Sequence, residues 1–344
     1  MLRSNRPLPL MLMGMAMMIC AVQAGAQALD PPLSGLPYWD STNQVLFSRE
    51  GFSSPGFVVR GYERTHQRGA DINISKDFPG VREVFIDSST AGPAGTTLIA
   101  TTLNFGDRNV QGAILTYDSG GHLLKTWSPP QYAQVIAYTK DDDALFVLGD
   151  RDAPDGPNAP NYPLLVEYDL EGRVLKSMLP ASMLMNRGDS FRRGGEIGEP
   201  ALRVTKDRIY IYAPADGNVV ICNRDGEILT HRSIRDVVER ISKQDGYQLG
   251  QTHALDFSDD GNIVLELLLF NGRGYELGVF RINLETGKAT SLHKGFNGTP
   301  LFFVGMKGSQ CLYLWLGRDI YIQVDDALEP VPLSAAMEKP AAVN

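Results

Sequence analysis

The feature that most constrains the fold is a hairpin motif that recurs along the chain. Residues 163–179, PLLVEYDLEGRVLKSML, show it clearly: an apolar run ends at Tyr168, an acidic turn containing Gly172 follows, and a second run begins at Val174. β-Branched and aromatic residues on both sides of a short Asp/Gly turn are typical of a β-hairpin. Successive turns lie 51, 54, 60 and 41 residues apart, an irregular period near 50 that is typical of propeller blades. Similar stretches lie at 113–127, 218–233 and 277–292, with weaker copies at 56–74 and 319–333.

Two further strand-like runs precede each copy from residue 113 onward, so the repeating unit has four short antiparallel strands. The second run of each unit is nearly all apolar, as expected for a strand buried between neighbouring blades. The sequence therefore predicts an all-β fold, a β-propeller of six blades with four antiparallel strands each. Residues 38–77 form the first blade; in the alternative, residues 38–47 supply a closing strand to the last blade. The paired runs lie at 81–89 and 96–104, 133–142 and 144–150, 201–207 and 208–214, 253–261 and 262–270, and 300–308 and 311–317.

The D-x-x-G hairpins and two Asp-Gly turns, SDDGN at 258–262 and RDGE at 224–227, resemble those of six-bladed β-propellers of the NHL and TolB-like groups. The resemblance is architectural and covers nearly the whole chain after residue 28. Such propellers include binding and scaffold proteins, lactonases and lyases. The resemblance therefore implies a fold and no single activity.

The N-terminus has the organisation of a signal peptide. Arg3 and Arg6 form a basic region, residues 8–22 are apolar and rich in methionine, and Ala26-Gln27-Ala28 is a small-x-small cleavage site. The apolar run is shorter than the roughly 20 residues that span a bilayer. We therefore expect residues 1–28 to be a signal peptide, 29–333 a single propeller domain and 334–344 a disordered tail. The predicted location is periplasmic or secreted, with no membrane insertion after cleavage.

The charge and the cysteine content of the chain limit the kinds of partner and cofactor that we expect. The formal net charge is −8, and removing two arginines with residues 1–28 makes it −10; an acidic protein of this kind argues against nucleic acid as a partner. Cys222 and Cys311 lie in apolar strand-like runs, which favours buried free thiols over a disulfide. No CxxC or histidine pairing accompanies them, so we predict no metal site and no cofactor.

Four units place an arginine just past the end of their second strand: Arg108, Arg151, Arg273 and Arg318. In a propeller these links gather on one face around the channel. A ring of guanidinium groups there suits a carboxylate, a phosphate or an acidic peptide, so the predicted partner is an anionic small molecule or a protein. The alternative is a set of structural ion pairs with neighbouring aspartates.

His253 opens the run HALDF of a predicted inner strand and is the best candidate for a catalytic base. Residues 233–246 have apolar positions at helical spacing, which predicts an amphipathic helix that packs on the blades or forms a lid. The function predicted best is an exported, non-catalytic binding or interaction module that binds on the loop face around the channel. The alternative is a channel-centred hydrolase or lyase of the lactonase type; a third interpretation is an envelope scaffold.

Overall fold

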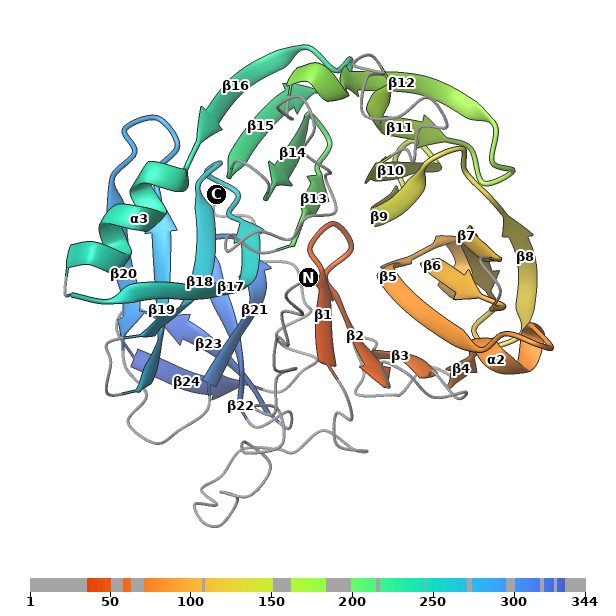
Figure 1. Cartoon of the computed structure of the whole chain (residues 1–344), viewed down its shortest axis with the longest axis horizontal. Coiled ribbons are helices and arrows are strands. Elements are labelled where there is room, and N and C mark those ends of the chain that lie inside the picture. The colour runs from red at the N-terminus through yellow and green to blue at the C-terminus, as the bar shows by residue number, and fades with distance from the viewer. Residues whose placement is uncertain are drawn as a thin grey trace, which may run out of the picture.

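The computed structural model describes residues 36–50, 58–62, 71–106, 109–150, 162–183, 199–214, 217–244, 246–270, 274–294, 301–315, 319–324 and 327–331. They form six four-stranded antiparallel sheets, each a meander of consecutive strands. Figure 1 shows the sheets arranged as blades around a common centre, with the first strand of each blade innermost. The chain is therefore a six-bladed β-propeller, as the repeats predicted.

The blades follow one another in chain order. Blades 1 and 2 contain β1 (Leu36–Asp40), β2 (Val45–Glu50), β3 (Val58–Tyr62) and β4 (Ile72–Asn73), then β5 (Glu83–Ala91), β6 (Thr97–Asn104), β7 (Val110–Tyr117) and β8 (Leu123–Trp127). Blades 3 and 4 contain β9 (Tyr132–Thr139), β10 (Ala144–Asp150), β11 (Pro163–Tyr168) and β12 (Val174–Pro180), then β13 (Ala201–Val204), β14 (Arg208–Ala213), β15 (Asn218–Asn223) and β16 (Ile228–Ser233). Blades 5 and 6 contain β17 (Gln248–Phe257), β18 (Ile263–Phe270), β19 (Tyr275–Ile282) and β20 (Ala289–Lys294), then β21 (Leu301–Lys307), β22 (Gln310–Trp315), β23 (Asp319–Val324) and β24 (Ala327–Val331).

The ring closes without an exchanged strand. β1 pairs with β2 and β2 with β3, so the alternative in which residues 38–47 complete the last blade is wrong. The closing contact joins Trp39 of β1 to Gly305 of β21, where an added Cβ would lie 2.2 Å from the indole Cδ1. Only glycine leaves room for this approach, so the indole packs directly on the backbone of blade 6.

The second strands form the core, as their apolar composition predicted. In β10 the side chains from Ala144 to Leu148 are all fully buried, and neighbouring apolar clusters contact them from blades 2 and 4. A strand that is covered on both faces buries every side chain, so it shows no polar alternation. Burial between blades therefore supplies the main cohesive force of the ring.

The outer hairpins confirm the predicted turn chemistry. Asp169 Oδ1 accepts hydrogen bonds from the backbone N–H groups of Glu171 and Arg173 at 2.9 and 2.8 Å. Gly172 has a φ of +81°, and a Cβ there would lie 2.8 Å from the ring of Trp127 in the preceding blade. The turn thus needs glycine both for its backbone conformation and for packing between blades. Asp118 and Asn223 bond their own turns in the same way.

Cations on the outer strands of blades 2 and 3 join the turns of blades 3 and 4 to the blade before them. Lys125 Nζ of β8 donates to Leu170 O of blade 3 at 2.8 Å. Lys176 Nζ of β12 donates to Arg224 O of blade 4 at 3.1 Å. These bonds satisfy exposed turn carbonyls and set the spacing of the blades at the rim.

The predicted amphipathic helix is α3 (Arg235–Gln244), between blades 4 and 5. Ile234, Val237, Val238 and Ile241 are buried against residues of both blades. The helix therefore contributes to the core. A second, four-residue helix, α2 (Ile74–Asp77), follows β4. No helix among the described residues is long and apolar enough to cross a membrane.

The two cysteines within the described residues are free and buried. Burial raises the pKa of the Cys222 and Cys311 thiols to about 11. The prediction of buried, unreactive thiols is confirmed.

Candidate functional site in the central channel

The four arginines predicted to ring the channel, Arg108, Arg151, Arg273 and Arg318, lie outside the described residues. The strands that precede them, β6, β10, β18 and β22, are described, and each is the second strand of its blade. Their C-terminal ends therefore share one face of the ring, which we call the loop face. The ring of arginines stays a prediction.

His253 does not open its strand as predicted. β17 begins at Gln248, and register shifts leave Gly250 and His253 as extra residues opposite β18. These two β-bulges break the alternation that reveals a strand, which is why its start was misplaced. The backbone of His253 thus lies at a bulge within the inner strand. Its side chain is outside the described part of the structure, so its role as a base stays a prediction.

Similar bulges recur in the inner strands of four blades. The extra residues are Asp87 in β5, Gln134 in β9, His253 in β17 and Val304 in β21. Each stands three to five residues before the end of its strand. At about 3.3 Å per residue, they lie at comparable depth in the channel. We call these four residues the bulge layer; bulges next to functional sites serve to re-aim side chains.

Two members of the bulge layer lie side by side on adjacent blades. Ser88 Oγ accepts a hydrogen bond from Ile136 N at 3.1 Å, and Asp87 directly precedes Ser88 while Gln134 stands two residues before Ile136. Tyr38 of blade 1 bonds to the same Ser88 hydroxyl at 2.9 Å. Three blades therefore meet at this point.

The turn between β1 and β2, residues 41–44, extends into the middle of the ring (Figure 1). We call it the plug. Its polar side chains bond to different blades: Thr42 Oγ1 accepts from Val204 N of blade 4 at 3.1 Å, Asn43 Nδ2 donates to Tyr138 O of blade 3 at 3.0 Å, and Ser41 bonds to Asp256 of blade 5. The plug closes the end of the channel opposite the loop face.

Asp40 anchors the plug. Its carboxylate is 4% exposed and accepts bonds from Thr42 N and Asn43 N within the turn, and from Thr90 Oγ1 and Ala91 N of blade 2 at 2.7 and 3.0 Å. Burial raises the pKa of Asp40, although these donors favour the charged form. Removing the carboxylate would leave several N–H groups unpaired in a dry environment.

Side chains of one blade also accept bonds from the inner strand of the next. An inner strand pairs with another strand on one edge only, so the backbone N–H groups of its other edge need other acceptors. The acceptors are Ser88, Thr90, Asp256 and Glu266, which bond to the backbone N–H groups of Ile136, Tyr138, Met306 and Phe303 at 3.1, 3.2, 2.7 and 3.0 Å. The ring is thus held at its centre by polar contacts as well as by packing.

The two buried acids of blade 5 have displaced pKa values. Burial raises the pKa of Asp256 to about 6, although Arg203 and two backbone N–H groups favour its charged form. Burial raises the pKa of Glu266 to about 8, with one backbone N–H opposing. Arg203 is itself buried and bonds to Phe257 O and to Asp259. No cluster of three or more His, Cys, Asp or Glu within the described residues is arranged to hold a metal ion.

Several buried polar atoms of the described residues have no hydrogen-bond partner. Seven buried side-chain atoms of the described residues make no hydrogen bond, and five of them lie on inner strands or in the plug. The five are Trp39 Nε1, Gln44 Oε1, Ser89 Oγ, Gln134 Nε2 and Thr252 Oγ1. An unpaired buried polar atom in a native fold calls for an unseen partner such as water or a ligand.

The sequence analysis did not identify Asp87, Gln134 or the plug. The available signal was small: one polar residue in each of two apolar runs, VFIDS and YAQVIAYT. The plug reads as an ordinary polar turn, DSTNQ. Only the ring geometry places these residues in the channel.

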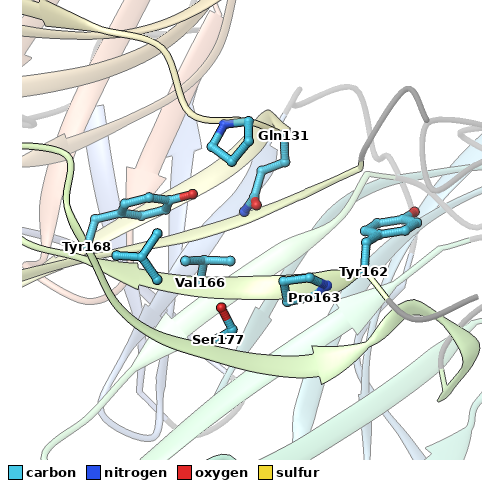
Figure 2. A pocket seen from close by; sticks show the side chains of 8 residues that line it. Gln131, Tyr162, Pro163, Val166, Tyr168 and Ser177 are labelled. Carbon is cyan, nitrogen blue, oxygen red and sulfur yellow. The ribbon is translucent and has the colours of Figure 1, made fainter. Parts of the chain in front are cut away.

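A separate pocket of about 110 Å³ lies on the side of blade 3. Val166 and Tyr168 of β11 form part of its lining, together with Gln131, Tyr162 and Ser177. Figure 2 shows the Tyr168 hydroxyl pointing toward Gln131; this hydroxyl is buried and makes no hydrogen bond within the described structure. Burial raises the pKa of Tyr168 to about 12. The pocket is distinct from the channel.

Comparisons with known proteins agree with the architecture. The sequence matches no family model and no curated protein. Similar solved structures include a streptogramin B lyase (11% identity, 89% of this chain and 85% of the other, TM-score 0.46), a chain of a nidogen/laminin complex (12%, 83% and 90%, 0.43) and a gluconolactonase from Xanthomonas campestris (13%, 89% and 88%, 0.45). These similarities carry no argument about function. The arrangement of its own six sheets identifies the chain as a β-propeller, and the plug closes one end of its channel.

Proposed function

We propose that the protein is an exported, non-catalytic binding module that takes its ligand or protein partner on the loop face, at the end of the channel opposite the plug. The plug carries this proposal. It bonds to blades 2, 3, 4 and 5, so it blocks entry of a ligand into the channel from this end. A channel closed at its base is suited to hold a ligand.

The buried acids support binding over catalysis. Asp40, Asp256 and Glu266 each accept a backbone N–H from another blade. A general acid or base needs its oxygen within reach of a substrate proton. These carboxylates instead join the blades, and their role in stability explains their burial.

The arginine prediction fits the same face. Arg108, Arg151, Arg273 and Arg318 follow the ends of β6, β10, β18 and β22, and all four ends belong to the loop face. A carboxylate or phosphate group of a small molecule or of an acidic protein segment is the partner that such a set would bind. Export rests on the signal-like residues 1–28.

Isothermal titration calorimetry with citrate, inorganic phosphate and an oligoglutamate peptide tests the arginine set. The variant carries alanine at all four positions. Its control removes four exposed cations from turns on the plug face or its outer rim: Lys140, Lys206, Arg208 and Lys288. We expect binding to at least one probe that the first variant loses and the control retains. Equal binding by both variants would contradict a role for the arginines.

The enzyme alternative has its own test. Hydrolysis of gluconolactone and of γ-butyrolactone is followed by acid release for the native protein and for His253→Ala. We expect no turnover above the uncatalysed rate. Saturable turnover that His253→Ala abolishes would replace the binding proposal with a channel-centred hydrolase.

A further inference from the structure

We propose that the pocket on the side of blade 3 is a binding site for a small, uncharged ring compound that carries one hydroxyl or carbonyl oxygen. The Tyr168 hydroxyl at the floor of the pocket donates the hydrogen bond that this oxygen accepts. The lining comes from β11, β12 and the segment before β9, and it includes no residue of the plug or the bulge layer. The inference therefore goes beyond the proposed function, and neither depends on the other.

The pocket has a buried floor and an exposed rim. Tyr168 and Gln131 are only 1% and 5% exposed. Val174 of the rim is 54% exposed, and Pro130 and Ser177 are exposed as well. A ligand therefore enters from solvent beside described residues. The volume of about 110 Å³ suits part of one five- or six-membered ring, since an enclosed cavity of ~150 Å³ holds benzene.

Blades 2 and 3 treat an equivalent tyrosine differently. Tyr117 ends β7 and Tyr168 ends β11, so both stand directly before the outer hairpin turn. The Tyr117 hydroxyl donates to Asp77 Oδ2 at 3.0 Å, and Asp77 belongs to the segment that joins blades 1 and 2. The segment that joins blades 2 and 3 contributes Gln131 to the pocket instead, and the buried Tyr168 hydroxyl has no partner among the described residues. A buried hydroxyl of this kind calls for a partner from outside the chain.

Gln131 controls access to this hydroxyl. Figure 2 shows the Tyr168 hydroxyl pointing toward Gln131. Gln131 Nε2 donates to Val147 O at 3.2 Å, at the long end of the normal range for a hydrogen bond. Because the hydroxyl is buried, the ligand oxygen reaches it once the Gln131 side chain turns aside. The weak hydrogen bond of Gln131 makes this movement inexpensive.

The lining determines the class of ligand. Most of the wall consists of proline, valine and tyrosine side chains, which favour an apolar ring: Pro130, Pro163, Val166, Val174, Tyr162 and Tyr168. None of the described lining side chains carries a charge, so a charged ligand would lose its hydration without an ionic partner. One hydroxyl at the floor calls for one oxygen on the ligand.

NMR titrations with phenol, cyclopentanone and benzene test the site. Benzene has the ring of phenol without its oxygen. We expect saturable binding of phenol and cyclopentanone by the native protein and about tenfold weaker binding of both by Tyr168→Phe, because one buried hydrogen bond is lost. Benzene should bind equally to the two proteins. Tyr117→Phe makes the same change at the equivalent position of blade 2 and, as the matched control, should bind phenol like the native protein.

A second pair of variants tests the place of the site without changing Tyr168. Ser177 pairs with Val166 at the pocket, and Thr126 pairs with Leu115 at the corresponding place of blade 2; Ser177 and Thr126 are both exposed. Ser177→Trp should fill the mouth of the pocket and abolish the binding of phenol and of benzene, whereas Thr126→Trp should leave both unchanged. A thermal melt should show that both variants fold, since exposed positions tolerate substitution.

Three results would overturn the site. They are no saturable binding of phenol or cyclopentanone, equal phenol binding by the native protein and Tyr168→Phe, and unchanged phenol binding by Ser177→Trp. The first result would mean that only water fills the pocket. The arginine variants of the proposed function are tested with other probes, so the two proposals fail separately.

Discussion

Both the inner and the outer strands of this propeller contain β-bulges, but the residues at these bulges differ. The outer strands of blades 2, 3 and 4 each carry a bulge just after the hairpin turn, and the extra residue is a leucine every time: Leu124, Leu175 and Leu229. The bulges of the inner strands carry Asp87, Gln134, His253 and Val304. The rim repeats its side chains, whereas the channel differs from blade to blade.

The repeated bulges of the outer strands serve the fold, whereas the varied bulges of the inner strands are suited to a functional site. A bulge on an edge strand disrupts the ladder and protects the edge from pairing with another chain, so one solution serves blades 2, 3 and 4 alike. On the inner strands the extra residues of the bulges are of four different types. Variation of this kind builds an asymmetric site from a repeated scaffold, because each blade contributes a separate group.

The largest expected effect is a pH dependence of stability, which differs between the buried acid Glu266 and the turn acid Asp169. Glu266 has a folded-state pKa of about 8 against an ordinary value of 4.5, so the folded protein binds this proton more tightly than the unfolded chain. The contribution of Glu266 to the free energy of unfolding is fully present below about pH 4.5 and is lost as the pH rises through 8. The total loss is on the order of 4 kcal/mol. Urea unfolding should show that the free energy of unfolding declines from pH 5 to pH 8. In the Glu266→Gln variant this decline should be smaller.

The partly buried turn acid Asp169 should behave in the opposite way. Its turn N–H groups and Arg173 outweigh desolvation and lower its pKa, so its contribution is present above the ordinary value and is lost as the pH falls through the lowered one. Asp169→Asn should therefore change only the acid limb of the profile. A profile in which Glu266→Gln keeps the decline toward pH 8 would contradict the burial of Glu266.

The next effect compares the anchor of the plug with the anchor of an outer turn. Asp40→Ala should reduce the free energy of unfolding by about 3 kcal/mol, because buried donors of two blades lose their acceptor. Asp169→Ala should cost much less, since water replaces the carboxylate at the rim. Urea titration of both variants measures the difference. Equal costs would mean that the plug is solvated and does not seal the channel.

A smaller effect tests the outer turn itself. Gly172→Ala should cost about 2 kcal/mol, because the residue has a positive φ and the new Cβ would meet the ring of Trp127. Gly274→Ala is the control, since its φ is not positive and nothing lies within 4 Å of an added Cβ. Thermal unfolding should show a loss for the first and little change for the second. A tolerated Gly172→Ala would show that the rim packing is looser than the contacts indicate.

The smallest effect compares two unpaired hydroxyls. Tyr168→Phe removes a buried hydroxyl on the side of blade 3 and should raise the free energy of unfolding by about 1 kcal/mol. Thr252→Val makes the matching change on an inner strand. If an unseen water or ligand bonds to the Thr252 hydroxyl, the second variant should not gain stability. A gain of equal size for both, measured by chemical denaturation, would argue against a partner in the channel.

Much of the fold could be predicted because its cause is local. Asp169 and Gly172 define a turn through hydrogen bonds and φ within five residues, and the same pattern repeats in blades 2 and 4. The second strands are continuous apolar runs, and this composition alone predicts that they are buried. The start of β17 was misplaced because bulges at Gly250 and His253 shift the register, and a bulge depends on the partner strand as well as on the sequence.

The site was harder to predict because its contacts join distant parts of the chain. Thr42 bonds to Val204 and Asn43 to Tyr138, and no local pattern links these residues. Hydrogen bonds between blades depend on how six sheets close into a ring. The arginines of the loop face were found from their position after a repeated strand, and their role stays a prediction.

Local chemistry dictates the repeating hairpin, the number of blades and the apolar strands between them, because turn chemistry and hydrophobic pattern act over a few residues. Tertiary structure alone decided that blade 1 closes the ring through Trp39 and Gly305, that residues 41–44 plug the channel, and that Asp87 and Gln134 lie side by side. The reason is physical: a turn is formed by neighbours in the chain, whereas a channel exists only once the blades have met.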